Sequence, residues 1–493
     1  MGTIGLGRPR VRGRSLEPSP PAITTAFIVV SSWKRPAPSV GCAMANQGHR
    51  AACIGQVSHR GLILLKGRCS GKKPPRGAII LPSIGGGSLM EGSIPSTDAR
   101  SMLPWPSWVE VDLDALCHNV RAVRQAVGPN CTVMAVVKAQ GYGHGAEAAA
   151  RAALEGGAAW LGVARVREGV LLREAGIEAP ILVLGPMAPA EVGTVVELGL
   201  RPTVVSLEQA VALSMVARRV GTTVAVHVKV ETGLGRYGIP VEELLSWLPA
   251  ASRLPGLVWE GLYSHFASAD EEDLSYSVAQ LESFRAARER LRVAGFDFQV
   301  CHMAASAAFH GISASHMDMV RIGLSLYGLY PSSHVRRGAI LRAALSVHSR
   351  IARVFALEAG RSVGYGRSFV AERPMRVALV PMGYADGLPR SHSNNGFVLV
   401  NGRRAPIVGR VSMDQCVVDV SDCGQVAVGD PVVVIGSQGG ESIDCDEFAA
   451  RSGTISYEVL TSIGLRLPRV YMRDGRVVSV AFLDEGRMVP WQP

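Results

Sequence analysis

The sequence lacks the features of a membrane protein and of a metal or disulfide protein. It contains no uninterrupted apolar run of about 18 residues, the length that a membrane-spanning helix needs, so we expect no membrane association. Its 9 cysteines form no Cys-x-x-Cys pair and no zinc-type spacing with histidine. We therefore expect no metal site, no disulfide framework and a reducing compartment such as the cytoplasm.

The main part of the chain also lacks an excess of either charge. Residues 1–100 hold 14 of the 51 Lys and Arg and 3 of the 41 Asp and Glu, which leaves 37 basic and 38 acidic residues for the rest. The net charge of +10 therefore belongs to the N-terminal region. Because a nucleic-acid surface needs cations clustered on the folded part, we expect no nucleic-acid partner.

Residues 1–104 differ from the rest in composition. They are rich in Gly, Pro, Ser and Arg and show little periodicity, which predicts a low-complexity, basic and disordered extension. The apolar stretch 22–30 is short and interrupted, unlike a signal peptide. An organelle transit peptide is one alternative, but Met90 and Met102 stand just before the ordered pattern and favour a translation start there.

From about residue 132, short apolar runs alternate with amphipathic stretches whose apolar residues recur every three or four positions. The runs are 133–137, 160–163, 181–184, 202–205, 224–230, 258–263, 298–302 and 317–321, and the helical stretches include 145–154, 165–175, 207–220 and 274–293. This alternation predicts an α/β fold, a TIM-like (β/α)8 barrel over 105–335. An open doubly wound sheet is the rival, but no Gly-x-Gly-x-x-Gly follows the first strand.

After about residue 332 the apolar runs become short, β-branched and separated by Gly, Asp or Asn turns. They lie at 375–381, 396–400, 405–411, 416–420 and 431–435. We therefore expect a β-rich C-terminal domain over 336–493. The alternating stretch 107–113 also predicts a strand, and this first strand can join the β-rich domain.

Lys138 stands at the carboxyl end of the first predicted barrel strand, where barrel enzymes carry their reactive groups. A lysine beside an apolar strand end can have a lowered pKa and form a Schiff base with an aldehyde. The glycines that follow permit a tight backbone, and Tyr142 can offer its hydroxyl to an anion. On this segment alone, a surface lysine that caps a strand explains the pattern equally well.

The segment Val136–Gly145 resembles the pyridoxal-phosphate lysine motif of alanine racemases, which are fold-type III pyridoxal-phosphate enzymes. Further segments resemble that family in the same order, and the resemblance runs from about Trp105 to the C-terminus. They are 229–236, 263–270, 319–324, 363–366, 383–387, 409–414 and 455–458. Eight segments in order are far more specific than any one of them.

The resemblance implies an isomerase that interconverts L-alanine and D-alanine with pyridoxal 5'-phosphate, supplying D-alanine for bacterial peptidoglycan. An imine with the cofactor makes the Cα proton acidic, because the ring spreads the carbanion charge. Lys138 is implied to hold the cofactor and to act as the base on one face. Tyr365 is implied to act on the other face in the partner subunit's barrel, so the active form is a homodimer. His265 is implied to stand beside Tyr365 and favour its phenolate, since an unperturbed tyrosine is a poor base at neutral pH.

The resemblance also implies how the cofactor is held. Arg321 faces the pyridine nitrogen, and because a guanidinium keeps its protons, it leaves that nitrogen unprotonated and disfavours transamination. Neutral donors hold the phosphate: Tyr142, Ser306, Tyr457 and the backbone of Gly323 and Leu324. Arg236 contacts the ring oxygen and the substrate carboxylate, and Lys229 matches a lysine that is carbamylated in some members to hold that arginine.

The implied substrate contacts come from the second domain. Met413 and Asp414 match the segment that contacts substrate from the partner subunit. Tyr384 narrows the entrance together with Tyr365, which favours alanine over larger amino acids. The chain departs from the family pattern at Ala305, where asparagine is common, and at Gln140, where the family has a shorter amide.

Three alternatives remain. The first is an amino-acid decarboxylase of similar architecture, which pairs the pyridine nitrogen with a carboxylate and uses a Gly-rich phosphate loop. Arg321 and the Tyr365 segment argue against this alternative. A broader-specificity amino-acid racemase is typically exported, and no convincing signal peptide is present. A non-catalytic pyridoxal-phosphate-binding regulatory protein lacks the β-rich domain that this chain is expected to have.

Overall fold

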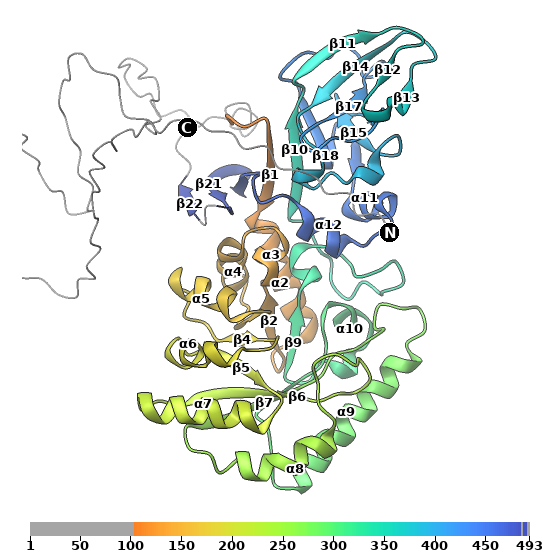
Figure 1. Ribbon diagram of the computed structural model, residues 1–493. Helices are drawn as coiled ribbons and strands as arrows, with labels where there is room; N and C mark the ends of the chain where they lie inside the picture. Colours follow the sequence, from red (N-terminus) through yellow and green to blue (C-terminus); the bar gives the residue numbers. More distant parts are fainter. Residues whose placement is uncertain (1–102, 485–486, 491–493) are drawn as a thin grey trace, which may run out of the picture. The chain divides into compact units, whose positions relative to one another are not determined.

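The computed structural model describes residues 103–484 and 487–490 (Figure 1). The extension expected over residues 1–104 therefore lies outside the described residues except for its last two. No helix of the described part is long and apolar enough to cross a membrane.

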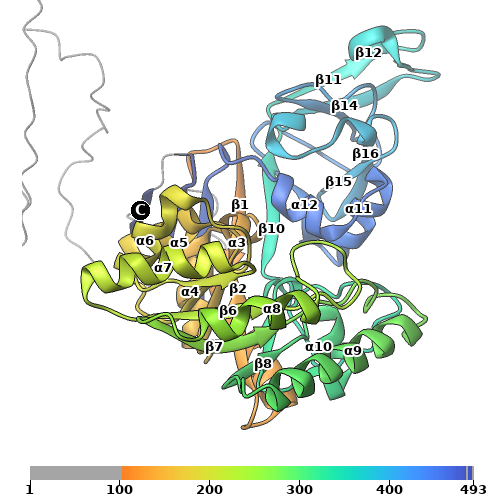
Figure 2. The same cartoon turned by 60° about the horizontal axis from the view of Figure 1, so that its bottom comes forward.

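The first part of the described chain is a nearly closed parallel barrel, which confirms the predicted fold. Its strands follow the order β8-β7-β6-β5-β4-β3-β2-β9. Two backbone hydrogen bonds join the two ends of this order: the Asp318 N–H donates to the Cys301 carbonyl at 3.1 Å, and the Arg321 N–H donates to the Ala304 carbonyl at 3.0 Å. Figures 1 and 2 show the helices arranged around these strands. The strands are β2 (Thr132–Val136), β3 (Trp160–Val163), β4 (Ile181–Val183), β5 (Arg201–Val204), β6 (Val224–Lys229), β7 (Leu257–Tyr263), β8 (Val300–His302) and β9 (Met319–Ile322).

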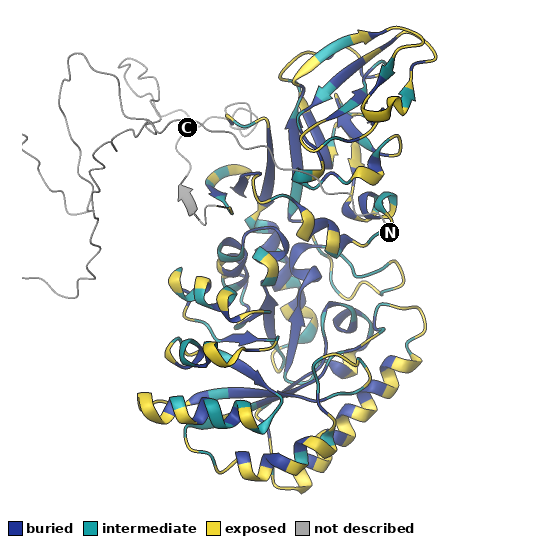
Figure 3. Cartoon of the chain, viewed as in Figure 1, coloured by how far each residue is buried: buried dark blue, intermediate teal, exposed yellow. Residues whose placement is uncertain are grey.

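The barrel helices have one buried and one exposed face, which is visible as alternating colours along α7 and α9 in Figure 3. In α7 (Leu207–Val220), Ser206 caps the first turn by accepting from the Gln209 N–H at 3.4 Å, and Gly221 ends the helix in the left-handed region. The other helices are α2 (Leu113–Val127), α3 (Lys138–Tyr142), α4 (Ala146–Glu155), α5 (Val166–Glu174), α6 (Val192–Glu197), α8 (Val241–Ala251), α9 (Ser275–Val293) and α10 (Ser306–Gly311).

The second part is β-rich, as predicted, with a 9-stranded sheet of order β16-β15-β18-β10-β1-β20-β21-β22 in which β19 pairs with β18. There are two smaller sheets: one contains the strands β11, β14 and β17 in that order, and the other contains β12 and β13. The strands are β10 (Leu345–Arg350), β11 (Arg353–Leu357), β12 (Ser362–Val363), β13 (Phe369–Val370), β14 (Met375–Val380), β15 (Phe397–Val400), β16 (Arg403–Pro406), β17 (Cys416–Asp419), β18 (Pro431–Gln438), β19 (Glu441–Ile443), β20 (Arg469–Arg473), β21 (Arg476–Phe482) and β22 (Arg487–Pro490).

Strand β1 (Ser107–Asp112) lies in the middle of the large sheet, between elements from the other end of the chain. It pairs antiparallel with β10 and parallel with β20. Its last residue, Asp112, caps α2 by accepting from the Ala115 N–H at 2.9 Å. The chain therefore passes from the β-rich sheet directly into the first barrel helix.

Two features of the β-rich part differ from the sequence-based expectation. It contains the helices α11 (Cys445–Ser452) and α12 (Ser456–Ser462), of which α11 begins at the capping side chain of Asp444. The run expected as a strand over 405–411 stops at Pro406, on the edge strand β16. Proline cannot donate to a sheet, and Gly409 at φ +79° turns the chain away.

Candidate active site

The expected site residues fall into two groups. The first lines one cavity of about 1090 Å³ at the carboxyl ends of the barrel strands. Its members are Lys138, Tyr142, Lys229, Arg236, His265, Ser306, Arg321, Gly323, Leu324 and Tyr457. Residues that are scattered over the sequence are thus brought together, because parallel strands deliver their ends to the same rim.

Lys138 opens an unusual backbone turn at the end of β2. The next four residues, 139–142, all have φ between +51° and +60°, so they form a left-handed helical turn. Such a conformation costs roughly 1–2 kcal/mol for each residue with a side chain. Strain of this kind persists only where the surroundings impose it, and such strained residues cluster at functional sites, so the turn marks this cavity as a candidate.

Contacts from both parts of the chain impose this turn. The Glu168 carboxylate accepts from the Ala139 N–H at 2.6 Å and from two backbone N–H groups after β3. Arg469, which is fully buried, donates to the Gly143 carbonyl at 2.9 Å and to three carbonyls of 463–467. A Cβ on Gly143 would lie 2.2 Å from the Leu460 carbonyl, so the turn and α12 are in close contact.

The pKa values of the two lysines in the cavity, Lys138 and Lys229, are lowered by their surroundings. Burial lowers the pKa of Lys138, and the nearby charge of Arg236 lowers it further, although Glu168 opposes this. Burial and the charges of Arg236 and Arg321 lower the pKa of Lys229 to about 8. Both lysines therefore have a larger neutral fraction than a surface lysine, as a nucleophile or base requires.

One end of the cavity carries neutral hydrogen-bond donors. Ser306 Oγ accepts from the N–H groups of Gly323 at 3.1 Å and Ser325 at 3.2 Å, so its own hydrogen is left to donate. A Cβ on Gly323 would lie 2.5 Å from the Tyr142 hydroxyl, which shows how closely the backbone approaches it. Burial raises the pKa of Tyr142 and that of Tyr457, the latter to about 12, so both hydroxyls stay protonated. This end is suited to a phosphate group.

Arg321 is a buried cation that lies 3% exposed at the end of β9. Its guanidinium donates to the carbonyls of Ser264 and Met303 at 2.8 and 2.9 Å, and to Nδ1 of His265 at 3.0 Å. Because arginine can only donate, Nδ1 of His265 must be the acceptor, and its ring proton must lie on Nε2. Burial and the charge of Arg321 lower the pKa of His265, so the ring is a neutral Nε2–H donor.

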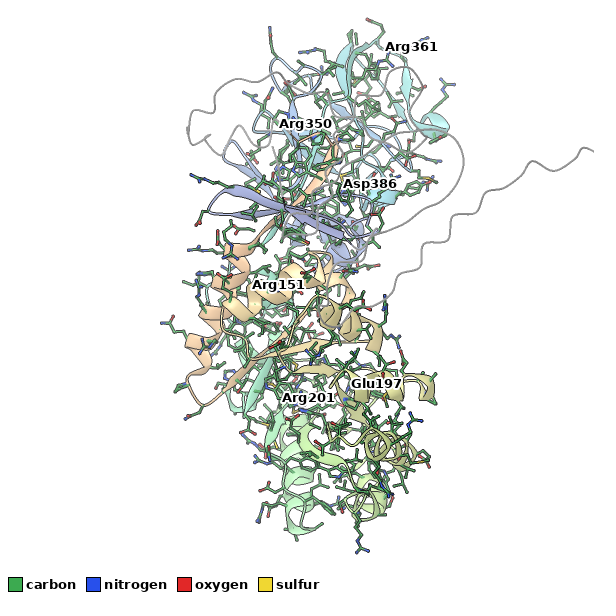
Figure 4. The ribbon with its side chains drawn as sticks, turned by 90° about the vertical axis from the view of Figure 1, so that its left-hand side faces the viewer. Arg151, Glu197, Arg201, Arg350, Arg361 and Asp386 are labelled. Atoms are coloured by element: carbon green, nitrogen blue, oxygen red, sulfur yellow. The ribbon has the colours of Figure 1, made fainter. Side chains whose placement is uncertain are left out.

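The second group lies in the β-rich part, outside this cavity. Tyr365 is 72% exposed, and Tyr384, Met413 and Asp414 are exposed as well. Arg466 forms ion pairs with Asp386 and with Asp414, each at 2.7 Å, and so connects the segment that carries Tyr384 to the segment that carries Met413. Figure 4 labels Asp386 in the β-rich part and Arg201 in the barrel. The four expected residues are therefore held at the surface rather than in this chain's own cavity.

Sequence reasoning missed several residues that hold the site. The Glu168 carboxylate accepts from the Arg165 N–H at 3.0 Å, and a glutamate in the first turn of the helix expected at 165–175 is the signal that could have found it. Nδ1 of His302, the last residue of the predicted strand 298–302, accepts from Arg321 at 2.8 Å. This residue could have been found by the rule that applied to Lys138, since it also stands at the carboxyl end of a barrel strand.

Comparison with known proteins gives a consistent picture. The alanine racemase N-terminal domain model matches residues 111–331, and the C-terminal domain model matches 344–471. The chain is 46% identical over 380 residues to an alanine racemase of Desulfosudis oleivorans, with 75% of this chain and 97% of the relative covered. An alanine racemase of Desulforamulus reducens is 44% identical over 369 residues, with 74% and 99% covered.

Solved structures are similar over the same region. The alanine racemase of Bacillus anthracis with bound L-Ala-P superposes with a TM-score of 0.74 at 38% identity, covering 78% of this chain and 100% of that one. The alanine racemase of Bartonella henselae with covalently bound pyridoxal phosphate gives a TM-score of 0.68 at 29% identity, covering 75% and 100%.

Proposed function

This chain belongs to the alanine racemase family, and from that premise we propose that it interconverts L-alanine and D-alanine with pyridoxal 5'-phosphate as its cofactor. The observation that carries the proposal is the cavity in which a lysine of lowered pKa, a buried arginine and a group of neutral phosphate donors meet. In a bacterial cytoplasm, the product would supply peptidoglycan synthesis.

The residues present fit this cofactor. The amine of Lys138 would bind its aldehyde carbon, Arg321 would donate to its ring nitrogen, and Arg236 would contact its ring oxygen. The hydroxyls of Tyr142, Ser306 and Tyr457, with the backbone of Gly323 and Leu324, would hold its phosphate without adding charge. When bound, the cofactor supplies an electron-withdrawing ring that makes the Cα proton of an amino acid acidic.

The chain then needs one proton carrier on each face of Cα. The Lys138 amine serves on the first face, because burial has lowered its pKa. On the second face we assign Tyr365 from another copy of the chain, since this side chain is exposed on its own subunit. The Nε2–H of His265 would donate to the Tyr365 oxygen and stabilise its phenolate. This division of labour requires a homodimer with shared active sites.

The same second copy would close the cavity around a small substrate. Tyr384, Met413 and Asp414 are exposed in the β-rich part, as Tyr365 is, and they would leave little room beyond a methyl group. Such a steric barrier is worth about 1–3 kcal/mol for each extra methylene. The lowered pKa of Lys229 increases the fraction of neutral amine, the form that carbamylation requires, and a gain of one carboxylate in intact-protein mass tests this assignment.

The test is to incubate the purified full chain with pyridoxal phosphate and, separately, with L-alanine and larger L-amino acids, and to measure D-enantiomers by chiral chromatography. We expect rapid D-alanine formation that is lost in Lys138→Ala. Formation of larger D-amino acids at similar rates would instead indicate a broader-specificity racemase. Binding of the cofactor with no D-product would indicate a regulatory protein and refute the proposal.

A further inference from the structure

A chain of polar side chains crosses the barrel interior behind Arg321. Arg321 contacts Nδ1 of His302 at 2.8 Å, and Nε2 of His302 contacts Nδ1 of His227 at 2.9 Å. Nε2 of His227 then contacts the carboxylate of Glu260 at 3.2 Å, which is also paired with Arg201 at 2.9 Å. Both histidines are fully buried, while Glu260 is 15% exposed and Arg201, labelled in Figure 4, is 24% exposed.

The order of donors along this chain is fixed at both ends. Arginine only donates, so Nδ1 of His302 must accept and its proton must lie on Nε2. That proton can only be donated to a bare Nδ1 of His227, whose own proton then lies on Nε2 and points at Glu260. A carboxylate only accepts, so the last link closes. Burial lowers the pKa of both histidines, which keeps each ring neutral with a single proton to place.

The backbone is shaped to hold these rings. Val226 pairs with Trp259 and His227 with Gly261, so Glu260 is an extra residue in β7 that forms a bulge. Bulges re-aim side chains near active sites. A Cβ on Gly261 would lie 2.2 Å from Nδ1 of His227, so only glycine leaves room for that ring.

We propose that Glu260 is a positioning residue for the racemisation: it fixes the tautomer of His227, so that the bare Nδ1 of His227 accepts from His302. His302 is thereby held as the acceptor for Arg321, which sets the orientation in which Arg321 meets the cofactor ring. The inference rests on the proposed function for what Arg321 contacts, but the donor order is a property of the chain itself. Without a fixed acceptor at Glu260, His227 can carry its proton on Nδ1, where it opposes the Nε2–H of His302. Either the His302 ring then turns or its proton moves to Nδ1, and both changes disturb the hydrogen bond that Arg321 donates.

The tautomers can be measured directly. In the full chain labelled with [¹⁵N]histidine, with and without pyridoxal phosphate, we expect NMR to show the proton on Nε2 of both His302 and His227. A proton on Nδ1 of His302 in the unmodified protein would overturn the proposal, whatever any variant does.

Glu260→Gln keeps the shape of the side chain but can offer either an oxygen or an N–H₂ group to His227. We expect mixed tautomers of both histidines, a shifted absorption maximum of the bound cofactor, and about a tenfold fall in kcat with little change in the KM for alanine, the size typical of outer partners of a site. Glu242→Gln, which removes an exposed carboxylate paired with Arg290, is the matched control and should change none of these.

The outcomes separate the two proposals. Unchanged tautomers and a kcat within about twofold in Glu260→Gln would refute the positioning role. Absence of D-alanine formation by the unmodified chain, with the expected tautomers present, would refute the proposed function and leave the donor order intact.

Discussion

Replacing Ser306 with alanine removes one oxygen that makes three interactions at once. Ser306 Oγ accepts from the N–H groups of Gly323 and Ser325 and keeps its own hydrogen for a bound phosphate. A hydrogen bond to a charged group contributes about 1.5–3 kcal/mol, which corresponds to roughly a tenfold to hundredfold change in Kd. Because a bound phosphate can accept from the two N–H groups that lose their partner, we expect the lower end, about tenfold.

The assay is a fluorescence titration of the cofactor-free protein with pyridoxal phosphate and with pyridoxal, which has no phosphate. We expect the Kd of pyridoxal phosphate to rise about tenfold in Ser306→Ala, while that of pyridoxal changes less than about twofold. Ser315→Ala is the control, since Ser315 is a fully buried serine that donates to the Ile312 carbonyl outside the cavity lining.

Comparing the Kd of pyridoxal phosphate with that of pyridoxal tests whether Ser306 contacts the phosphate. Equal weakening of both would mean that Ser306 only shapes the rim, and an unchanged Kd for pyridoxal phosphate would mean that the phosphate lies elsewhere.

Three further predictions test other parts of the site. Tyr365→Phe should lower kcat by about 10²–10⁴-fold, the usual contribution of a general acid or base, and Tyr384→Phe far less; equal losses would contradict the assignment. In protein without carbamylation, the pKa of Lys229 lies at about 8 instead of 10.5, so its charged form weakens the fold by about 3 kcal/mol below pH 8 and progressively less up to pH 10.5. Lys229→Met should therefore raise the free energy of unfolding most below pH 8, and a gain that is constant with pH would refute this. Arg469→Met leaves the Gly143 carbonyl and three others without their donor, and we expect about 3 kcal/mol of destabilisation in denaturant unfolding; an unchanged midpoint would refute the role given to Arg469.

The barrel could be predicted from the sequence because buried parallel strands are continuous apolar runs. Each of the eight expected runs overlaps an observed strand, and the expected stretch 207–220 coincides with α7. The short helices α11 and α12 were missed because they are too brief for a 3.6-residue period to stand out against their β-rich surroundings.

Some residues of the candidate site could be predicted from the sequence and others could not. Residues at strand ends, such as Lys138 and Arg321, follow from motif and position. The link between His227 and Glu260 does not, because a bulge shifts the register of β7 by one residue, and strict alternation assigns the side chains after it to the wrong face. Likewise, the left-handed turn after Lys138 includes Ala139, Gln140 and Tyr142, residue types that do not favour positive φ. Tertiary contacts impose it.

The position of β1 has a consequence for synthesis of the protein. Ser107 pairs with Ser349, 242 residues further along the chain. At about 5–20 residues per second, the ribosome needs about 10–50 s after making β1 before its first partner strand exists. During that time an apolar strand emerges with neither neighbour available, and the growing chain carries an open edge that other chains can pair with. Slower elongation would lengthen this exposure, so the yield of folded protein should depend on the speed of translation and on chaperones that cover β1.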